Sequence, residues 1–219
     1  MTRKTTSANR RGRQSGSAIL EFGLATLFMI PVFMGSMSVG MGLGLTTQVA
    51  EVARDAGHMF ARQVDFSQSA NQQLIVRLAS GMGLSTTGNG TGVVVLTKVM
   101  QISSVECTSA GYTTSTCTNI NFPVITQRVT IGSTASGFFT SNLGTPPTSF
   151  LQSDGTITPA NYLTQISCRA NTLVANGGSG LLTLQPSEIT YISEGYFQSA
   201  ALAFLNNNTP LNVYSRNYF

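Results

Sequence analysis

The sequence contains few charged residues, a single histidine and no tryptophan. Charged residues make up 9% of its 219 positions, against roughly a quarter in ordinary soluble domains. With His58 as the only histidine, no Ser–His or Cys–His pair can be recognised, and neither a nucleophile elbow nor a phosphate-binding loop is present. No two cysteine or histidine residues have the spacing of metal ligands. The sequence therefore predicts neither an enzyme nor a metal or cofactor site.

The formal net charge of +4 is concentrated at the amino terminus. Residues 1 to 16 contain no acid and five basic residues, Arg3, Lys4, Arg10, Arg11 and Arg13, so the rest of the chain is close to neutral. A nucleic-acid site would place basic residues on a folded face among polar or aromatic side chains, whereas these directly precede an apolar run. Positive residues that flank a hydrophobic segment stay in the cytoplasm. We therefore expect no nucleic-acid partner, an amino terminus inside the cell and export of everything after the segment.

The apolar run extends from Phe22 to Leu45, and its 24 residues include no charge. As a helix it would be roughly 36 Å long, enough to cross a bilayer core with some tilt. Pro31 removes one backbone donor and should kink the helix unless its surroundings absorb the change. The run also contains four glycines that either permit close helix packing or mark local unwinding, with unwinding slightly favoured: Gly35, Gly40, Gly42 and Gly44.

Beyond this run, apolar residues recur at helical spacing on one face, which predicts that the helix continues as an amphipathic stem to about Val64. They are Val49, Val52, Ala53, Ala56 and Phe60. Residues 71–79 predict a second, short helix. The stem would bury its apolar face against the part of the chain that follows it.

From residue 92 onward the pattern changes to β-branched and alternating residues. Residues 93–102, 122–131 and 189–197 predict three strands, separated by polar loops. Residues 158–170 predict one more helix, with Thr158 as its cap. A small antiparallel sheet packed on the end of the stem helix would bury the apolar faces of the strands. The expected fold class is α+β, with a leader (1–16), a membrane and stem helix (17–64) and an exported head (65–219).

A short stretch from Gly16 to Phe22 (GSAILEF) contains the acid that heads the apolar run. A carboxylate costs about 2.5 kcal/mol or more at the centre of a bilayer and less near its interface, so Glu21 needs a partner. Cleavage after Gly16 would create one, since the new α-amino group of Ser17 is a cation at the start of the helix. Glu21 of one subunit could then pair with the amino group of its neighbour.

This stretch resembles the processing site of type IV prepilins, and its Glu-Phe form resembles the TadE-like pseudopilins of tight-adherence (Flp) pili. Residues 53–62 (ARDAGHMFAR) are similar to the run that closes the stem helix in that family. Residues 189–197 (ITYISEGYF) resemble its carboxy-terminal strand, with a central acid and trailing aromatic residues. Pro31 lies farther from Glu21 than the family's proline usually does, and residues 85–182 match no family pattern.

The resemblance implies a minor pilin that a prepilin peptidase cleaves between Gly16 and Ser17. Ser17, Glu21 and Phe22 would make assembly contacts with other pilin subunits and with the inner-membrane assembly platform. The protein would reside in the bacterial inner membrane with an exported carboxy-terminal domain, and in the pilus after assembly. A principal filament subunit with an enlarged head is an alternative role.

Other interpretations of the amino terminus remain open. A secretory signal peptide would be cleaved near residues 36–38, and a plain anchor would not be cleaved at all. The chain would then be a secreted or single-pass, membrane-anchored binding module for an extracytoplasmic ligand. The three interpretations differ in the first mature residue, which is Ser17, a residue near Val39, or Met1 or Thr2.

The cysteines bear on the compartment of the head. Cys107 and Cys117 enclose a polar segment and could form a disulfide in an oxidising compartment. Closing so short a loop would add roughly 2 to 3 kcal/mol to the free energy of unfolding. Cys168 is left over, and is either buried and inert or paired with another cysteine.

Overall fold

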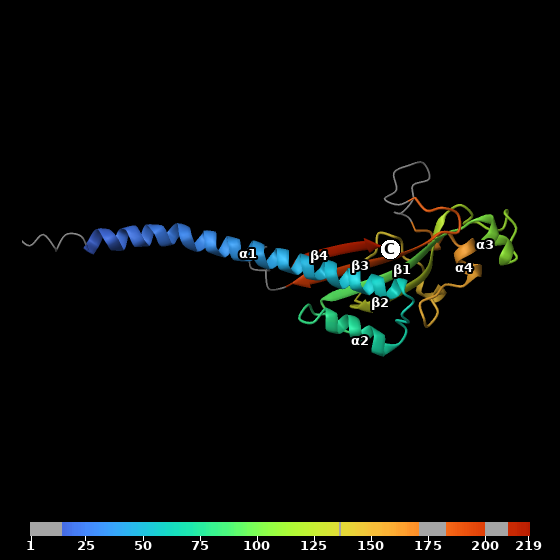
Figure 1. The fold of residues 1–219 in the computed structure, drawn as a ribbon, viewed down its shortest axis with the longest axis horizontal. Helices are drawn as coiled ribbons and strands as arrows, with labels where there is room; N and C mark the ends of the chain where they lie inside the picture. The colour runs from blue at the N-terminus through green and yellow to red at the C-terminus, as the bar shows by residue number, and fades with distance from the viewer. Residues whose placement is uncertain (1–14, 136, 171–182, 200–209) are drawn as a thin grey trace, which may run out of the picture. The chain divides into compact units, whose positions relative to one another are not determined.

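The computed structural model describes residues 15–135, 137–170, 183–199 and 210–219 (Figure 1). The chain divides into two compact units, Met1–Leu43 and Gly44–Phe219. Helix α1, Ser15–Ala61, runs through the boundary between them. The predicted leader, residues 1–16, lies outside the described residues apart from its last two positions.

The described part of the first unit consists of α1 alone. The helix is unbroken at Pro31 and at all four glycines between residues 35 and 44. Unwinding at the glycines, which the sequence slightly favoured, does not occur. A proline removes a single donor and each glycine costs only about 1 kcal/mol relative to alanine, so the hydrogen bonds on either side maintain the helix.

The second unit is built on one antiparallel sheet with strand order β2-β1-β3-β4. The strands are β1 (Gly92–Gln101), β2 (Pro123–Gly132), β3 (Ile189–Ser199) and β4 (Leu211–Tyr218). The first three are confirmed to within two residues of their predicted limits. Strand β4 was not predicted; it pairs with β3 from Ile192↔Tyr218 to Ser199↔Leu211 and forms one edge of the sheet. The chain therefore has the predicted α+β composition, with a long apolar helix and a small four-stranded antiparallel sheet.

Helices α1 and α2 (Ser69–Leu78) contribute to the core on one face of the sheet. All five residues predicted for the apolar face of the stem are buried. They belong to a unit that begins at Gly44, so the last 18 residues of α1 fold with the sheet, whereas the sequence analysis placed the head after residue 64. The helix approaches β3 closely, since a Cβ on Gly195 would lie 3.2 Å from Cβ of Ala53.

The opposite face of the sheet is covered mainly by irregular chain between residues 133 and 170. The core on this face contains Val99, Ile125 and Ile192 of the sheet, together with residues of the covering chain such as the buried Cys168. Helix α4 (Pro159–Thr164) begins at the predicted position but is followed by a 3₁₀ turn at Ile166–Cys168. Thr158 precedes α4 without forming a side-chain cap hydrogen bond.

A third small core lies beyond the end of β1, around the disulfide between Cys107 and Cys117. Helix α3 (Ser104–Ser109) begins with a capping box, in which Ser103 accepts from the amide of Val105 and the Glu106 carboxylate accepts from the Ser103 amide. Burial raises the pKa of Glu106, but hydrogen bonds from Ser103 and Ser187 outweigh it and leave the pKa below its usual range. The disulfide joins α3 to the polar chain that leads into β2.

Candidate functional site: the apolar helix and the polar network of the sheet

The predicted assembly residues lie at the start of α1. Gly16 and Ser17 belong to its first turn, and the side chain of Ser17 lies outside the described part of the chain. Glu21 is exposed, and Phe22 is 75% exposed. No charged residue follows Glu21 in α1 until Glu51, so Glu21 is the single acid at the head of an apolar stretch of the helix.

Between residues 22 and 43, α1 exposes large apolar side chains along its length. Phe22, Leu27, Phe28, Met29, Val32 and Phe33 are each at least two-thirds exposed. Among the described residues this is the one helix long and apolar enough to cross a membrane, as judged by length and composition alone, with a mean hydropathy of 1.9 over its most apolar window. A surface of this kind is stable in lipid or against apolar partners and unfavourable in water.

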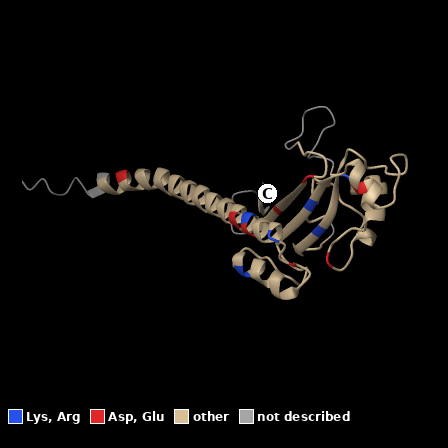
Figure 2. Ribbon diagram, turned by 45° about the vertical axis from the view of Figure 1, so that its right-hand side comes forward, with Lys and Arg blue, Asp and Glu red and all other residues tan. Residues whose placement is uncertain are grey.

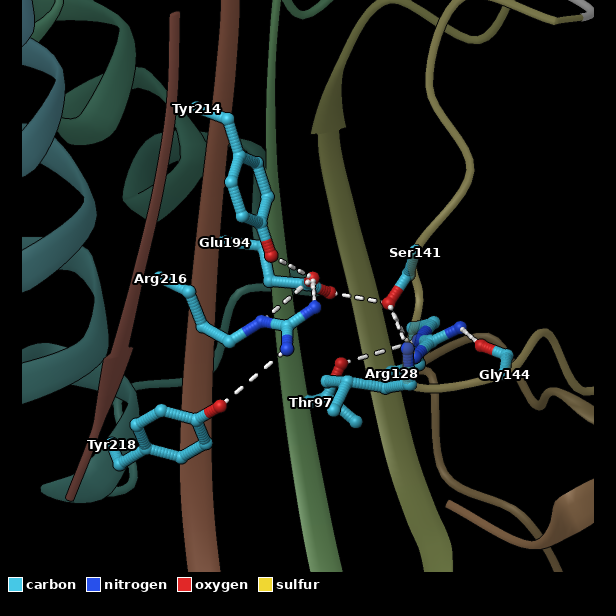
Figure 3. A network of polar contacts seen from close by, with 9 residues as sticks. Thr97, Arg128, Ser141, Gly144, Glu194, Tyr214, Arg216 and Tyr218 are labelled. Atoms are coloured by element: carbon cyan, nitrogen blue, oxygen red, sulfur yellow. Dashed lines mark hydrogen bonds and ion pairs between the residues drawn. The ribbon is translucent and has the colours of Figure 1, made fainter. Parts of the chain in front are cut away.

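The second unit contains a buried polar network on the sheet face opposite α1 and α2 (Figure 3). Its centre is Glu194 of β3, whose side chain is fully buried. Arg216, directly opposite on β4, donates from Nη2 to Glu194 Oε1 at 2.8 Å and from Nε to the same oxygen at 3.2 Å. Tyr214 donates its hydroxyl hydrogen to Oε1 at 2.7 Å. Arg216 and Glu194 form the one ion pair among the described residues, and this pair joins the edge strand β4 to the central strand β3.

The other carboxylate oxygen connects the network to the covering chain. Ser141 Oγ donates to Glu194 Oε2 and accepts from the amide of Leu143 at 3.2 Å. Arg128 of β2 donates to Ser141 Oγ, to the carbonyl oxygen of Gly144, and from Nε to Thr97 Oγ1 at 3.2 Å. The network therefore connects all four strands of the sheet to residues 141–144.

Burial sets the protonation of these groups. It lowers the pKa of Arg128 to about 10, although the nearby Glu194 carboxylate raises it. Burial, followed by the hydrogen bond to Glu194, raises the pKa of Tyr214 far above its ordinary value. Arg128 and Arg216 are therefore cationic and Tyr214 is neutral across the physiological pH range.

A pocket of about 530 Å³ lies beside this network. We call it the sheet pocket, and define it by Val93, Val95, Arg128, Thr130, Phe139 and Asp154 among its lining residues. Much of its remaining lining carries hydroxyl groups, at Ser133, Thr134, Thr140, Ser141, Thr145, Thr148 and Ser153. No sequence motif includes these residues.

No group of three or more histidine, cysteine or acidic residues is placed to hold a metal ion within the described ranges. Cys168 is a free thiol, and burial raises its pKa. Figure 2 shows how sparse the charged residues are over the described helices and strands.

Comparison of the chain with protein-family models, curated proteins and solved structures finds no match. The family resemblance therefore depends on the residues quoted from the sequence.

Proposed function

We propose that the chain is a membrane-anchored, prepilin-like subunit of a bacterial pilus system, with a structural and assembly role. The observation that carries the proposal is the exposed apolar surface of α1 between residues 22 and 43, headed by the single acid Glu21. A helix of this composition inserts in a membrane, with the preceding basic residues retained in the cytoplasm. The second unit is then exported to an oxidising compartment, which suits the disulfide between Cys107 and Cys117.

In the proposed mechanism, a prepilin peptidase hydrolyses the bond between Gly16 and Ser17. The α-amino group released on Ser17 is cationic near neutral pH, since such groups have a pKa of about 8. It pairs with Glu21 of a neighbouring subunit, while Phe22 and the following apolar side chains pack against that neighbour's helix. A carboxylate costs about 2.5 to 3.5 kcal/mol in the middle of the bilayer, and the pairing offsets such a cost at the helix head.

The size of the second unit favours a minor subunit. Residues 44–219 form a folded unit with three separate core clusters. Packing of the apolar helix in a filament does not require a folded unit of this size. A large head suits a component that initiates assembly or caps the pilus. A principal filament subunit with an enlarged head is the alternative within the same class.

The first test is the mature amino terminus, measured by mass spectrometry on protein expressed with and without the peptidase. We expect a chain that begins at Ser17 in the presence of the peptidase and an unprocessed chain in its absence. A mature protein that begins near Val39 would identify a signal peptide, and one that begins at Met1 or Thr2 a plain anchor. Either result would contradict the prepilin assignment.

The second test is Glu21→Ala, with Glu51→Ala as its matched control. Both carboxylates are exposed on α1, but Glu51 lies in the second unit, outside the apolar run. We expect both variants to be processed at Ser17, and the amount of assembled pilus to fall at least about tenfold for Glu21→Ala only, as loss of a pair worth over 1.4 kcal/mol implies. Normal assembly by Glu21→Ala would refute the pairing and leave the processing result intact.

A further inference from the structure

The sheet pocket has a floor built by two neighbouring strands. Val93 and Val95 are alternate residues of β1, and Arg128 and Thr130 are alternate residues of β2, so all four lie on one face of the sheet. The valines are almost fully buried, so they close the base of the pocket and present little surface of their own to a ligand. The volume of about 530 Å³ lies within the range of about 300–1,000 Å³ typical of small-molecule sites.

Two walls of the pocket are fixed to β2 by hydrogen bonds. On one side, Arg128 holds the chain at residues 141–144 through Ser141 Oγ and the Gly144 carbonyl oxygen. On the other side, the Arg128 amide donates to the carbonyl oxygen of Gly155 at 2.8 Å, and Gln127 Nε2 donates to the carbonyl oxygen of Asp154 at 3.0 Å. The pocket is thus held open by the fold, as a preformed binding site requires.

The charges in the lining are one cation and one anion. Arg128 and Asp154 form no ion pair with each other, and the carboxylate nearest to Arg128 in the network, Glu194, is already bonded to Arg216. Asp154 Oδ1 accepts from the amide and hydroxyl groups of Thr156, at 2.9 and 2.6 Å. Those bonds hold the pKa of Asp154 below its usual range, so it is ionised near neutral pH. Its Oδ2 accepts no hydrogen bond from the described residues and is available to a ligand.

An aromatic ring and several hydroxyl groups complete the lining. Phe139 stacks on Tyr196 and Tyr214, with ring centroids 5.2 and 5.8 Å apart, which fixes its position at the pocket. Thr140, Thr145, Thr148 and Ser153 are exposed and offer both donors and acceptors. The lining therefore alternates apolar surface with hydroxyl groups and adds a single carboxylate acceptor.

We infer that the sheet pocket binds an uncharged saccharide of one or two rings. The C–H faces of a sugar ring suit the partly exposed side chains of Phe139 and Leu151, and its hydroxyl groups suit the Ser and Thr side chains and Asp154 Oδ2. The pocket's formal charge is balanced, so a strongly anionic or cationic ligand gains no net attraction there. Arg128 acts as a positioning residue that keeps the 141–144 wall in place. This inference does not depend on the proposed pilus function.

The experiment uses the full chain in a detergent without a sugar headgroup, titrated with maltose, cellobiose and lactose by calorimetry and ligand-observed NMR. Digalacturonate and inorganic phosphate serve as charged probes. We expect saturable binding of at least one neutral disaccharide and weaker binding of both charged probes. Binding confined to digalacturonate or phosphate, or no binding of any neutral disaccharide at millimolar concentration, would overturn the inference.

Two variants locate the site without disturbing the core. Thr148→Trp fills the exposed lip of the pocket, and Thr108→Trp on α3 is its control, because Thr108 is exposed and does not line the pocket. Asp154→Asn removes the charged acceptor and should weaken binding by about tenfold or more, as loss of a hydrogen bond to a charged group implies. We expect Thr148→Trp to abolish binding and Thr108→Trp to preserve it, with unchanged thermal unfolding in all three. Saccharide binding retained by Thr148→Trp would place the ligand elsewhere and overturn the assignment.

Discussion

At the scale of single residues, Glu194 acquires its role from partners that are distant in the sequence. In the sequence Glu194 stands out only as the central acid of the strand at 189–197, and its main partner Arg216 lies on the strand that was not predicted. A signal for that strand existed. Tyr214, Arg216 and Tyr218 alternate, which gives one face of a strand an aromatic and cationic character. The intervening Asn and Ser residues masked this pattern, because they have low strand propensity.

The buried pair makes a specific prediction for Glu194→Gln. The amide keeps the size of the side chain but leaves the Arg216 cation, which is 13% exposed, without its counter-charge. Removing one partner of a buried pair costs about 3 to 5 kcal/mol. We expect the urea midpoint of the full chain to fall accordingly. The control is Glu188→Gln on the exposed chain before β3, with an expected change within about 0.5 kcal/mol.

A double variant that replaces both members of the pair tests the same contribution in a second way. In Glu194→Leu combined with Arg216→Met, neither member of the pair carries a charge, so part of the lost stability should return, although Arg128 also loses the nearby carboxylate. Equal stability of Glu194→Gln and the wild-type chain would show that the pair contributes nothing to the sheet.

At the scale of elements, periodicity predicted most of the regular structure. The apolar spacing from Val49 to Phe60 correctly identified the face of α1 that packs on the sheet, because that face is selected by burial. The chain covering the opposite face could not be predicted. Its course depends on single contacts, such as those of Ser141 and Gly144 with the network, which have no period. The covering chain forms much of the lining of the sheet pocket, and no pattern in the sequence indicated that pocket.

The turn at residues 152–156 yields a prediction for Gly155→Ala. Gly155 has a φ of +75°, and a Cβ there would lie 2.2 Å from the carbonyl oxygen of Arg128. Gly81 is a matched control, since its φ is +83° and a Cβ there would meet nothing within 4 Å. We expect Gly81→Ala to cost about 1 to 2 kcal/mol, from the left-handed backbone alone. Gly155→Ala should cost about 1 to 3 kcal/mol more, since the turn must also move away from β2.

Chemical denaturation of the two variants measures this difference directly. Hydrogen exchange at the Arg128 amide gives a local measurement, because that amide donates to the Gly155 carbonyl oxygen. Equal stability of the two variants would show that the turn relaxes without cost and that the pocket wall is not fixed.

At the scale of the whole molecule, the sequence correctly separated an apolar amino-terminal segment from a mixed α and β part. The predicted boundary lies at the end of the predicted helix, because a continuous helical period does not show that two parts of one helix belong to different units. The compact second unit instead begins at Gly44, inside α1. Burial explains the difference. Leu27 and Phe28 are exposed, whereas Val49 and Phe60 of the same helix are buried in the core of the sheet.

Two truncated chains distinguish these boundaries. A chain that begins at Gly44 retains the whole of the first core cluster and lacks the exposed apolar surface, so we expect a water-soluble monomer with a cooperative unfolding transition. A chain that begins at Asp65 lacks Val49, Val52 and Phe60, so only α2 and its flanking residues cover that face of the sheet. Loss of a large buried apolar side chain costs about 2 to 5 kcal/mol, so losing all three is comparable to the total stability of about 5 to 15 kcal/mol expected for a domain. Circular dichroism and size-exclusion chromatography should therefore show a folded monomer for the first chain and an unfolded or aggregated product for the second. A folded, soluble chain beginning at Asp65 would show that the second unit begins after α1 and that the sheet folds without this helix.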